Sequence, residues 1–321
     1  MISACLRCFL MLFMVLPIAI QAQTYPNRAL RFIVAYGPGG ANDLIGRIIA
    51  AELGTALKQP AYVENRPGAG AVIGTKALAE AAPDGYTVGL VTSTSMVTGP
   101  LLYKDVTYRP LEDFTHLIMV GTFPNALTVR GDNLTRSIQE LIARAKDSPQ
   151  RINYGSAGLG SIGHLTGELL SQVTGIKMVH VPYKGTAQAT LDLLGGRIDA
   201  MFDGLPTAAQ QVRAGKVRIL AVTGLQRELL APDVPTLAEV VPGLSGVAWF
   251  GVAAPAKTAA AITARLREDL VRILAAPETR KQLMDLGMTP TGTTGQPFID
   301  FIQAEIRKWG GVIKTANVKV E

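Results

Sequence analysis

Two glycine-rich stretches carry most of the chemistry that this sequence offers. The first, YGPGGAND, runs from Tyr36 to Asp43, and the second, GSAGLGSIGH, runs from Gly155 to His164. Glycine leaves the backbone N–H groups uncovered by side chains, and each stretch leads from a strand pattern into a helical one. Exposed N–H groups at the start of a helix bind anions, so both stretches are candidate anion sites.

The two stretches are roughly 120 residues apart, so they can face one cleft from opposite lobes. Backbone N–H groups and Ser or Thr hydroxyls can satisfy a carboxylate without a formal cation. In the first lobe we expect ligand contacts from Tyr36, Gly39, Gly40, Asn42, Asp43, Thr92 and Ser93. In the second lobe we expect them from Ser156, Gly158, Gly160, Ser161, His164, Lys184 and Asp203.

Several of these residues have a structural alternative. Asp43 is suited to stabilising the start of its own helix, and His164 is suited to closing its loop, and we favour these roles for both residues. Thr92 and the serines after it can act as helix caps, and Lys184 can simply be solvated. Asp203, at the end of a strand pattern, can hold a ligand amine, a bridging water or a loop backbone.

An enzyme is the alternative class. Gly158, Gly160 and Gly163 fit the dinucleotide pattern G-x-G-x-x-G, but the next strand pattern ends in VPYK and lacks the acidic residue that would hold a ribose. Ser161 lacks a nucleophile elbow, because Leu159 stands where the first glycine should be. With three scattered histidines we expect no catalytic residue, metal or cofactor.

The composition is that of a globular protein with substantial cores. The 321 residues are 48% hydrophobic and 17% charged, with a net charge of +6. Lys and Arg form no basic run, so we expect no nucleic-acid partner.

The first 22 residues are typical of a signal peptide. They contain Arg7 as their only charge, an apolar run from Phe9 to Ile20, and Ala22 before the expected cut. Cleavage would remove both Cys5 and Cys8. No later apolar stretch is long enough for a bilayer, so we expect an exported, periplasmic protein that is not embedded in the membrane.

Strand and helix patterns alternate regularly after Tyr25, which predicts two α/β lobes. Residues 115–130 read as two strands interrupted at Phe123 and Pro124, where the chain crosses to the second lobe. The pattern VRILAVT, at 217–223, predicts the strand that carries the chain back. We therefore assign residues 23–123 and 223–321 to lobe 1 and residues 124–222 to lobe 2.

Seven ordered segments after Tyr25 resemble signatures of the Bug family of periplasmic solute-binding proteins. They are YPNRALRFIVAYGPGGANDLIGR, YVENRPGAGAVIGT, APDGYT, INYGSAGLGSIGHLTGELL, VHVPYKG, LLGGRIDAMFDGLP and AGKVRILAVT. The resemblance implies a two-lobed, type 2 periplasmic-binding-protein fold, with two interlobe crossings, that closes by a hinge around a ligand.

The resemblance also implies the ligand and the partners. Expected ligands are di- or tricarboxylates, acidic amino acids or aromatic carboxylates, clamped by the loops at 36–43 and 156–161. Expected partners are the membrane subunits of a tripartite tricarboxylate transporter, and a sensor kinase is a further candidate. We expect a monomer. Asn42 stands where the family more often has Thr or Ser, and Tyr36 where it commonly has Phe.

Overall fold

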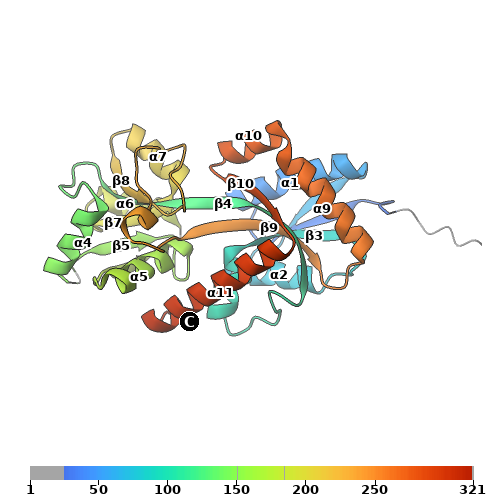
Figure 1. Ribbon diagram of the computed structural model, residues 1–321, viewed down its shortest axis with the longest axis horizontal. Helices are drawn as coiled ribbons and strands as arrows, with labels where there is room; N and C mark the ends of the chain where they lie inside the picture. The colour runs from blue at the N-terminus through green and yellow to red at the C-terminus, as the bar shows by residue number, and fades with distance from the viewer. Residues whose placement is uncertain (1–24, 150, 184, 320–321) are drawn as a thin grey trace, which may run out of the picture.

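The structure is a computed structural model that describes residues 25–149, 151–183 and 185–319. The chain forms two α/β lobes that lie side by side along the long axis of the molecule (Figure 1). The predicted signal peptide, residues 1–22, and Lys184 lie outside the described residues. No helix within the described ranges is both long enough and apolar enough to span a bilayer.

One sheet path runs through both lobes, and β4 belongs to both parts. The first part contains, in spatial order, β2 (Ala61–Asn65), β1 (Leu30–Val34), β3 (Thr87–Thr92), β9 (Val247–Pro255), the first half of β4 (Phe114–Arg130) and β10 (Thr289–Thr294). The second part contains the other half of β4, with β7 (Ala200–Gly204) and β8 (Val217–Val222) on either side of it, then β5 (Asn153–Ser156) and β6 (Val179–Pro182). Strands β1, β2 and β3 are parallel, as are β5, β6 and β7, so the loops after them collect at one edge of each part.

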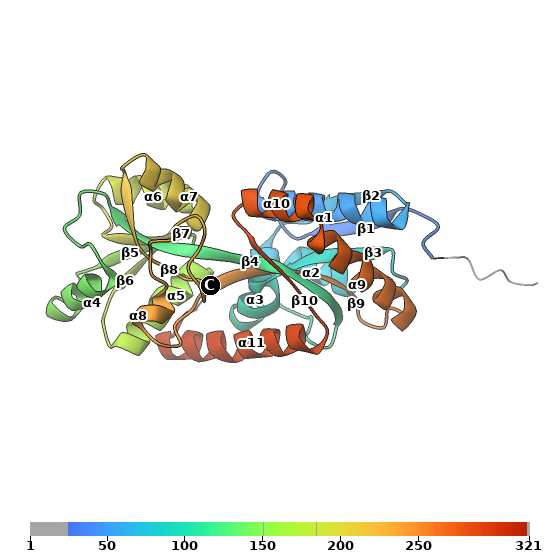
Figure 2. The ribbon, with the colours of Figure 1, turned by 45° about the horizontal axis from the view of Figure 1, so that its top comes forward.

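Helices cover both parts of the sheet (Figures 1 and 2). Lobe 1 carries α1 (Ala41–Leu57), α2 (Val72–Ala79), α3 (Gly99–Leu102), α9 (Ala260–Ala275), α10 (Pro277–Asp285) and α11 (Gln296–Ala316). Lobe 2 carries α4 (Ile138–Asp147), α5 (Ile162–Thr174), α6 (Thr186–Leu194), α7 (Leu205–Arg213) and α8 (Leu237–Val240). A short 3-10 turn spans Ala69–Ala71, and a π-helical turn, Thr94–Thr98, joins β3 to α3.

The first glycine-rich loop is held between two tightly packed elements. Ile45, Ile49 and Leu53 recur at the helical period on α1 and are fully buried against the β1 side of the sheet. A Cβ atom at Gly46 would lie 2.5 Å from Val34 Cγ2, so only glycine allows this approach of helix to strand. The packing fixes where the start of α1 can point.

Strand β4 makes the first crossing between the lobes without the predicted interruption. The expected interruption at Phe123 and Pro124 is wrong, because β4 runs unbroken for 17 residues. Pro124 pairs with Val247 at the end of the β9 ladder, and Asn125 already pairs with Gly204 of β7. The proline lies where β4 changes partners, so its missing N–H interrupts neither ladder.

The second crossing is made by β9 and not by the predicted strand at 217–223. That strand, β8, pairs with the lobe 2 half of β4, whereas β9 pairs with the lobe 1 half. Leu237, Val241 and Leu244 then pack in the core of the second sheet. The predicted lobe boundaries stay a prediction, and we propose that lobe 2 continues to about residue 246.

Helix α11 lies along both lobes (Figure 2). Trp309 and Val312 share a buried cluster with Ile162 and Leu165 of α5, and Gln172 Nε2 donates to the Val312 carbonyl at 3.1 Å. The C-terminal third is therefore packed on lobe 1, as predicted, and on lobe 2 as well.

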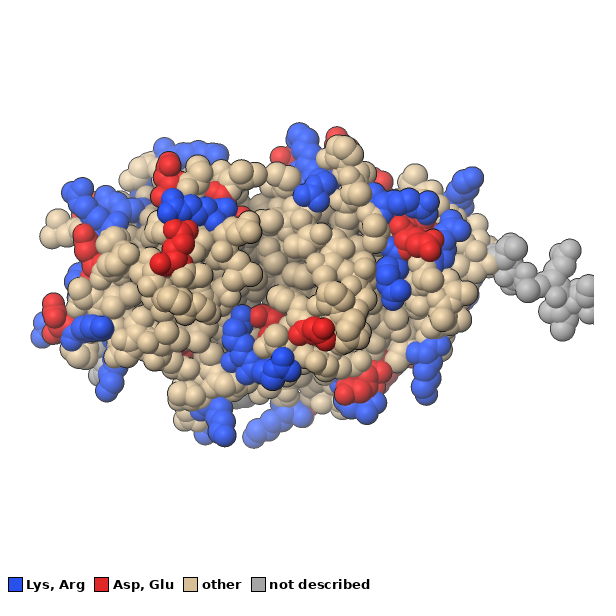
Figure 3. All heavy atoms as spheres, in the orientation of Figure 1, with Lys and Arg blue, Asp and Glu red and all other residues tan. Residues whose placement is uncertain are grey.

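Charged side chains are dispersed over the surface. On the face shown in Figure 3, Lys and Arg are scattered over both lobes and interleaved with Asp and Glu. This face therefore presents no extended patch of a single sign.

Candidate functional site

Asp43 ties the first glycine-rich loop to its neighbours. Its side chain is buried, and its Oδ2 accepts from the Gly39 N–H at 2.9 Å and from Arg47 Nε at 2.9 Å. Its Oδ1 accepts from Asn65 Nδ2 at 2.8 Å. The Arg47 guanidinium is the main reason that the pKa of Asp43 falls to about 2. Both oxygens are engaged, so this geometry gives Asp43 a positioning role.

The start of α1 is open to an incoming group. A Cβ atom at Gly37, Gly39 or Gly40 would meet no atom within 4 Å. The N–H groups of Ala41 and Asn42 form no hydrogen bond with another described residue. These helix-terminal donors, together with the positive end of the helix dipole, suit a negatively charged group.

Tyr36 joins this loop to the end of β3. Its hydroxyl lies 2.8 Å from Thr92 Oγ1, and burial raises its pKa. Thr92 Oγ1 also accepts from the Ser95 N–H, and Ser95 Oγ accepts from the Thr92 N–H, so Thr92 closes its own turn. The buried Ser93 hydroxyl forms no hydrogen bond with a described residue, which leaves it available to a ligand.

Two histidine side chains form hydrogen bonds with the second glycine-rich loop. The Nδ1 atom of buried His164 accepts from the Gly160 N–H at 3.0 Å. His180 Nε2 lies 2.7 Å from Ser156 Oγ, which also accepts from the Gly158 N–H at 3.2 Å. His164 therefore closes its loop, which is the structural alternative given above.

Burial lowers the pKa of His164 to about 4. Burial and the neighbouring His164 lower the pKa of His180 to about 3. Both rings are therefore neutral at pH 7, as the acceptor role of His164 Nδ1 requires.

Ser161 caps α5. Its Oγ accepts from the His164 N–H at 3.2 Å and donates to the Gly158 carbonyl at 2.8 Å. The next two N–H groups, from Ile162 and Gly163, form no hydrogen bond with another described residue. Helix α5 therefore presents free donors at its start, as α1 does.

The glycines of the two loops contribute shape more than donors. The N–H groups of Gly39, Gly158 and Gly160 are all used inside their own loops. Ligand contact by any residue of the predicted set stays a prediction.

The two glycine-rich loops are connected across the lobes through the segment from Thr92 to Leu102. Tyr36 contacts Thr92, and the segment after Thr92 leads to Leu102 at the end of α3. A Cβ atom at Gly160 would lie 2.3 Å from Leu102 Cδ1, so lobe 2 touches lobe 1 there. None of the five cavities of 370 to 610 Å³ that we identify among described residues is lined by either loop. A cavity shared by the loops stays a prediction.

Asp203 lies at the end of β7, opposite Ala126 of β4. Its Oδ1 accepts from the Gly204 N–H at 2.7 Å, and burial raises its pKa. The bond to its own loop matches one of the alternatives given above. The described residues contain no group of three or more His, Cys, Asp or Glu that could hold a metal ion.

Sequence reasoning missed three residues that shape the site: Arg47, Asn65 and Leu102. Asn65 Nδ2 donates to the Tyr36 carbonyl as well as to Asp43. A signal for Asn65 existed, because it ends the strand beside β1, and the carboxyl ends of parallel strands meet. Leu102 lies on the other lobe from Gly160, and no local pattern could have paired them.

Comparison with solved structures defines the class of protein. The chain superimposes on the periplasmic binding protein BugD with a TM-score of 0.75 and 33% identity, over 92% of this chain and 100% of that one. It superimposes on a structure of R. palustris Rpa4515 with adipate with a TM-score of 0.79 and 34% identity, over 92% of this chain and 99% of that one. For MatC from Rhodopseudomonas palustris with bound malate, the TM-score is 0.72 and the identity 30%, over 90% of this chain and 100% of that one. The fold is that of a two-lobed periplasmic binding protein, as predicted.

The sequence defines the family. The profile described as "Tripartite tricarboxylate transporter family receptor" matches residues 45–318. Protein BugT of Bordetella pertussis is 36% identical over 304 residues, which cover 94% of this chain and 93% of that protein. The chain belongs to the tripartite tricarboxylate transporter receptor family, and the resemblance to the Bug proteins is confirmed.

Proposed function

We propose that the protein is a periplasmic receptor that captures a small carboxylate between its lobes and delivers it to a tripartite tricarboxylate transporter. Membership of the receptor family supports this proposal, as do the relatives solved with adipate and malate. The ligand classes are di- or tricarboxylates, acidic amino acids and aromatic carboxylates.

The observation that carries the proposal is the pair of open helix starts. Ala41 and Asn42 on α1, and Ile162 and Gly163 on α5, offer backbone N–H groups without a partner among the described residues. Each hydrogen bond to a charged group contributes roughly 1.5 to 3 kcal/mol. Micromolar binding needs about 8 kcal/mol. Four such bonds contribute roughly 6 to 12 kcal/mol before the cost of association, so they can supply a large share of this energy without a cation in the site.

Closure follows from the position of these donors on opposite lobes. A ligand held by one lobe stabilises the closed form, because only that form lets the other helix start bond to it as well. The closed form is then the one that the membrane subunits receive. The predicted signal peptide supports export, and we propose that the mature protein works as a monomer. A sensor kinase is a further candidate partner.

A thermal-shift panel tests the proposal. The mature protein, without residues 1–22, is heated alone and with malate, adipate, citrate, glutamate or benzoate, and each hit is followed by calorimetry. We expect at least one carboxylate to raise the Tm saturably and to remain chemically unchanged. Conversion of the ligand, or no stabilisation by any carboxylate, would contradict a receptor role.

A further inference from the structure

Helices α7 and α10 belong to opposite lobes and lie next to each other across the gap between them (Figures 1 and 2). A Cβ atom at Gly287, just after α10, would lie 1.8 Å from Pro206 Cγ in α7. Thr289 Oγ1 donates to Glu228 Oε2 at 3.1 Å, which joins β10 to the loop at 224–231. These contacts depend on the relative position of the lobes. We call α7, α10 and this loop the α7–α10 surface.

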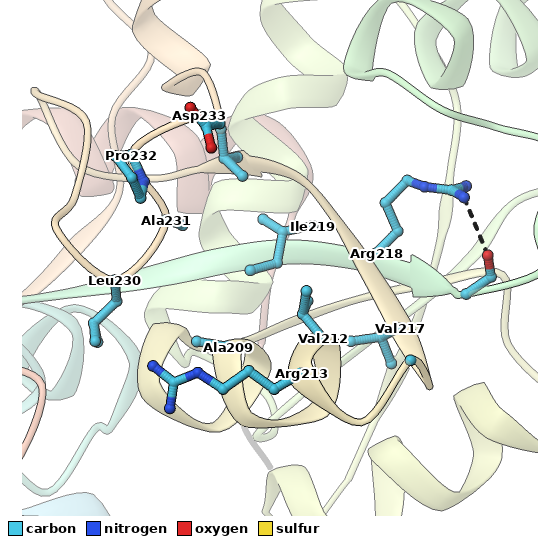
Figure 4. A pocket seen from close by; sticks show the side chains of 13 residues that line it. Ala209, Val212, Arg213, Val217, Arg218, Ile219, Leu230, Ala231, Pro232 and Asp233 are labelled. Atoms are coloured by element: carbon cyan, nitrogen blue, oxygen red, sulfur yellow. Dashed lines mark hydrogen bonds between the residues drawn. The ribbon is translucent and has the colours of Figure 1, made fainter.

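Two hollows run through the α7–α10 surface. One, of about 520 Å³, lies between α7, β8 and the turn at 230–234, and its lining is largely aliphatic (Figure 4). The other, of about 410 Å³, passes from α7 in lobe 2 to Met284 and Asp285 in lobe 1. Both are lined by Arg213 and Leu230, so the two hollows are adjacent, and we refer to them together as the depression.

Large apolar side chains are exposed on the α7–α10 surface. Leu229 is 82% exposed and Leu225 is 73% exposed, both on the loop at 224–231. Val212 on α7 and Met284 on α10 are about 40% exposed. An apolar area that extends over two lobes is typical of a surface that another macromolecule covers.

Two charged side chains of the depression, Arg213 and Asp233, form no ion pair or hydrogen bond with a described residue. They come from different sides of the hollow, Arg213 from α7 and Asp233 from the turn at 230–234 (Figure 4). Arg218 on the far side is different, because it donates to the Asn133 carbonyl at 2.9 Å. Lys281 and Asp285 on α10 satisfy each other at 2.7 Å. The complementary partner is therefore an apolar segment that carries a carboxylate close to Arg213 and away from Asp233.

We propose that the α7–α10 surface is the docking site for a periplasmic segment of the transporter's membrane subunits, apolar and bearing an acidic residue. The inference rests on the proposed receptor function. A surface on one lobe is the same in the open and the closed protein, whereas a surface built from both lobes changes with closure. Docking here would therefore let the transporter distinguish a loaded receptor from an empty one.

Single cysteines test the location. The chain lacks cysteine after Cys8, so Leu229→Cys and the control Leu134→Cys each place one thiol in the mature protein. Leu134 is also on lobe 2 and is 86% exposed, but it lies outside the α7–α10 surface. With a photo-crosslinker on the thiol, we expect Leu229→Cys to link to the reconstituted membrane subunits and Leu134→Cys to link at least tenfold less. Equal linking, or linking of Leu229→Cys to a second receptor copy, would overturn the proposal.

Transport assays test the function of the surface. Leu229→Asp and Arg213→Glu should bind the carboxylate found in the thermal-shift panel within twofold of wild type, but should lower its uptake into proteoliposomes at least tenfold. Leu134→Asp should change neither. Uptake by all three variants at the wild-type rate would overturn the docking site. Absence of ligand binding by the wild-type protein would instead contradict the receptor function, so the two failures are distinguishable.

Discussion

The rings of His164 and His180 are stacked beneath the second glycine-rich loop, with centroids 3.8 Å apart and planes 15° from parallel. One ring holds the Gly160 N–H and the other holds Ser156 Oγ, so the pair connects α5 and β6 to the loop. Glu168 Oε1 lies 3.9 Å from His164 Nε2 and accepts from the Tyr154 hydroxyl at 2.7 Å. The loop's shape therefore depends on two neutral imidazoles in contact.

This arrangement predicts a loss of stability at mildly acidic pH. In the folded protein the pKa of His164 is about 4 and that of His180 is about 3, whereas an unfolded histidine titrates near 6.5. Below pH 6.5 the unfolded state therefore takes up protons that the folded state does not. The free energy of unfolding should fall by up to about 1.4 kcal/mol per pH unit for each histidine between pH 6.5 and 4.

Urea unfolding at pH 7, 6 and 5 measures this slope. His180→Gln keeps a hydrogen-bonding group near Ser156 but removes one titrating site. The free energy of unfolding of this variant should therefore change less steeply with pH, by up to about 1.4 kcal/mol per pH unit. His116 is also buried, with its pKa lowered by burial, and it contributes equally to both proteins. An unchanged slope in His180→Gln would contradict the assignment.

A side chain at Gly160 should oppose closure of the lobes. Its Cβ would lie 2.3 Å from Leu102 Cδ1. We expect Gly160→Ala to weaken carboxylate binding at least tenfold by calorimetry. Gly175→Ala is the matched control, because Gly175 has a similar φ of +71° but no atom within 4 Å of a Cβ.

Both variants should lose about 1–2 kcal/mol of stability from the left-handed backbone alone. Only Gly160→Ala should also lose affinity, and Leu102→Ala should restore part of it. Equal affinities in the two glycine variants would show that the contact with Leu102 does not control closure.

Removal of the Asp43 carboxylate should loosen the first loop. Asp43→Ala leaves the Gly39 N–H and Asn65 Nδ2 without their acceptor, at a cost of roughly 2–3 kcal/mol in urea unfolding. Asp43→Asn retains one acceptor oxygen and should lose less. If Asp43→Ala kept full stability but lost binding, Asp43 would contact the ligand directly.

A bulky residue in place of Gly40 should abolish ligand binding without unfolding the protein. Gly40 has an ordinary φ of −84°, and a Cβ there meets no protein atom within 4 Å. The free energy of unfolding of Gly40→Val should therefore be lower than that of wild type by only about 1 kcal/mol, which is the cost of replacing glycine by valine at the N-cap of α1. The substitution should still abolish carboxylate binding, because the added methyls cover the start of α1. Wild-type affinity in this variant would place the ligand elsewhere.

Much of the fold could be predicted from periodicity and turn residues. The strand pattern at 217–223 corresponds to β8 (Val217–Val222), and α1 follows the predicted glycine loop. The errors at β4 and β8 arose because pairing partners are set by tertiary contacts. A proline normally ends a strand, and the local sequence does not show that Pro124 lies where β4 exchanges one partner for another.

The candidate site was predictable in outline only. Glycine spacing located both loops, but not which N–H groups point inward. That direction is set by Asp43, Ser156 and His164, whose side chains accept from the glycines. The contact between Leu102 and Gly160 required the lobes to be placed relative to each other, which sequence patterns do not encode.

The most direct test is a crystal structure of the mature protein with the tightest-binding carboxylate from the thermal-shift panel. We predict a carboxylate oxygen within about 3.2 Å of an N–H group at the start of α1, and another ligand oxygen within reach of the start of α5, directly or through one water. A carboxylate bound away from both helix starts, or held only by side-chain cations, would contradict the account.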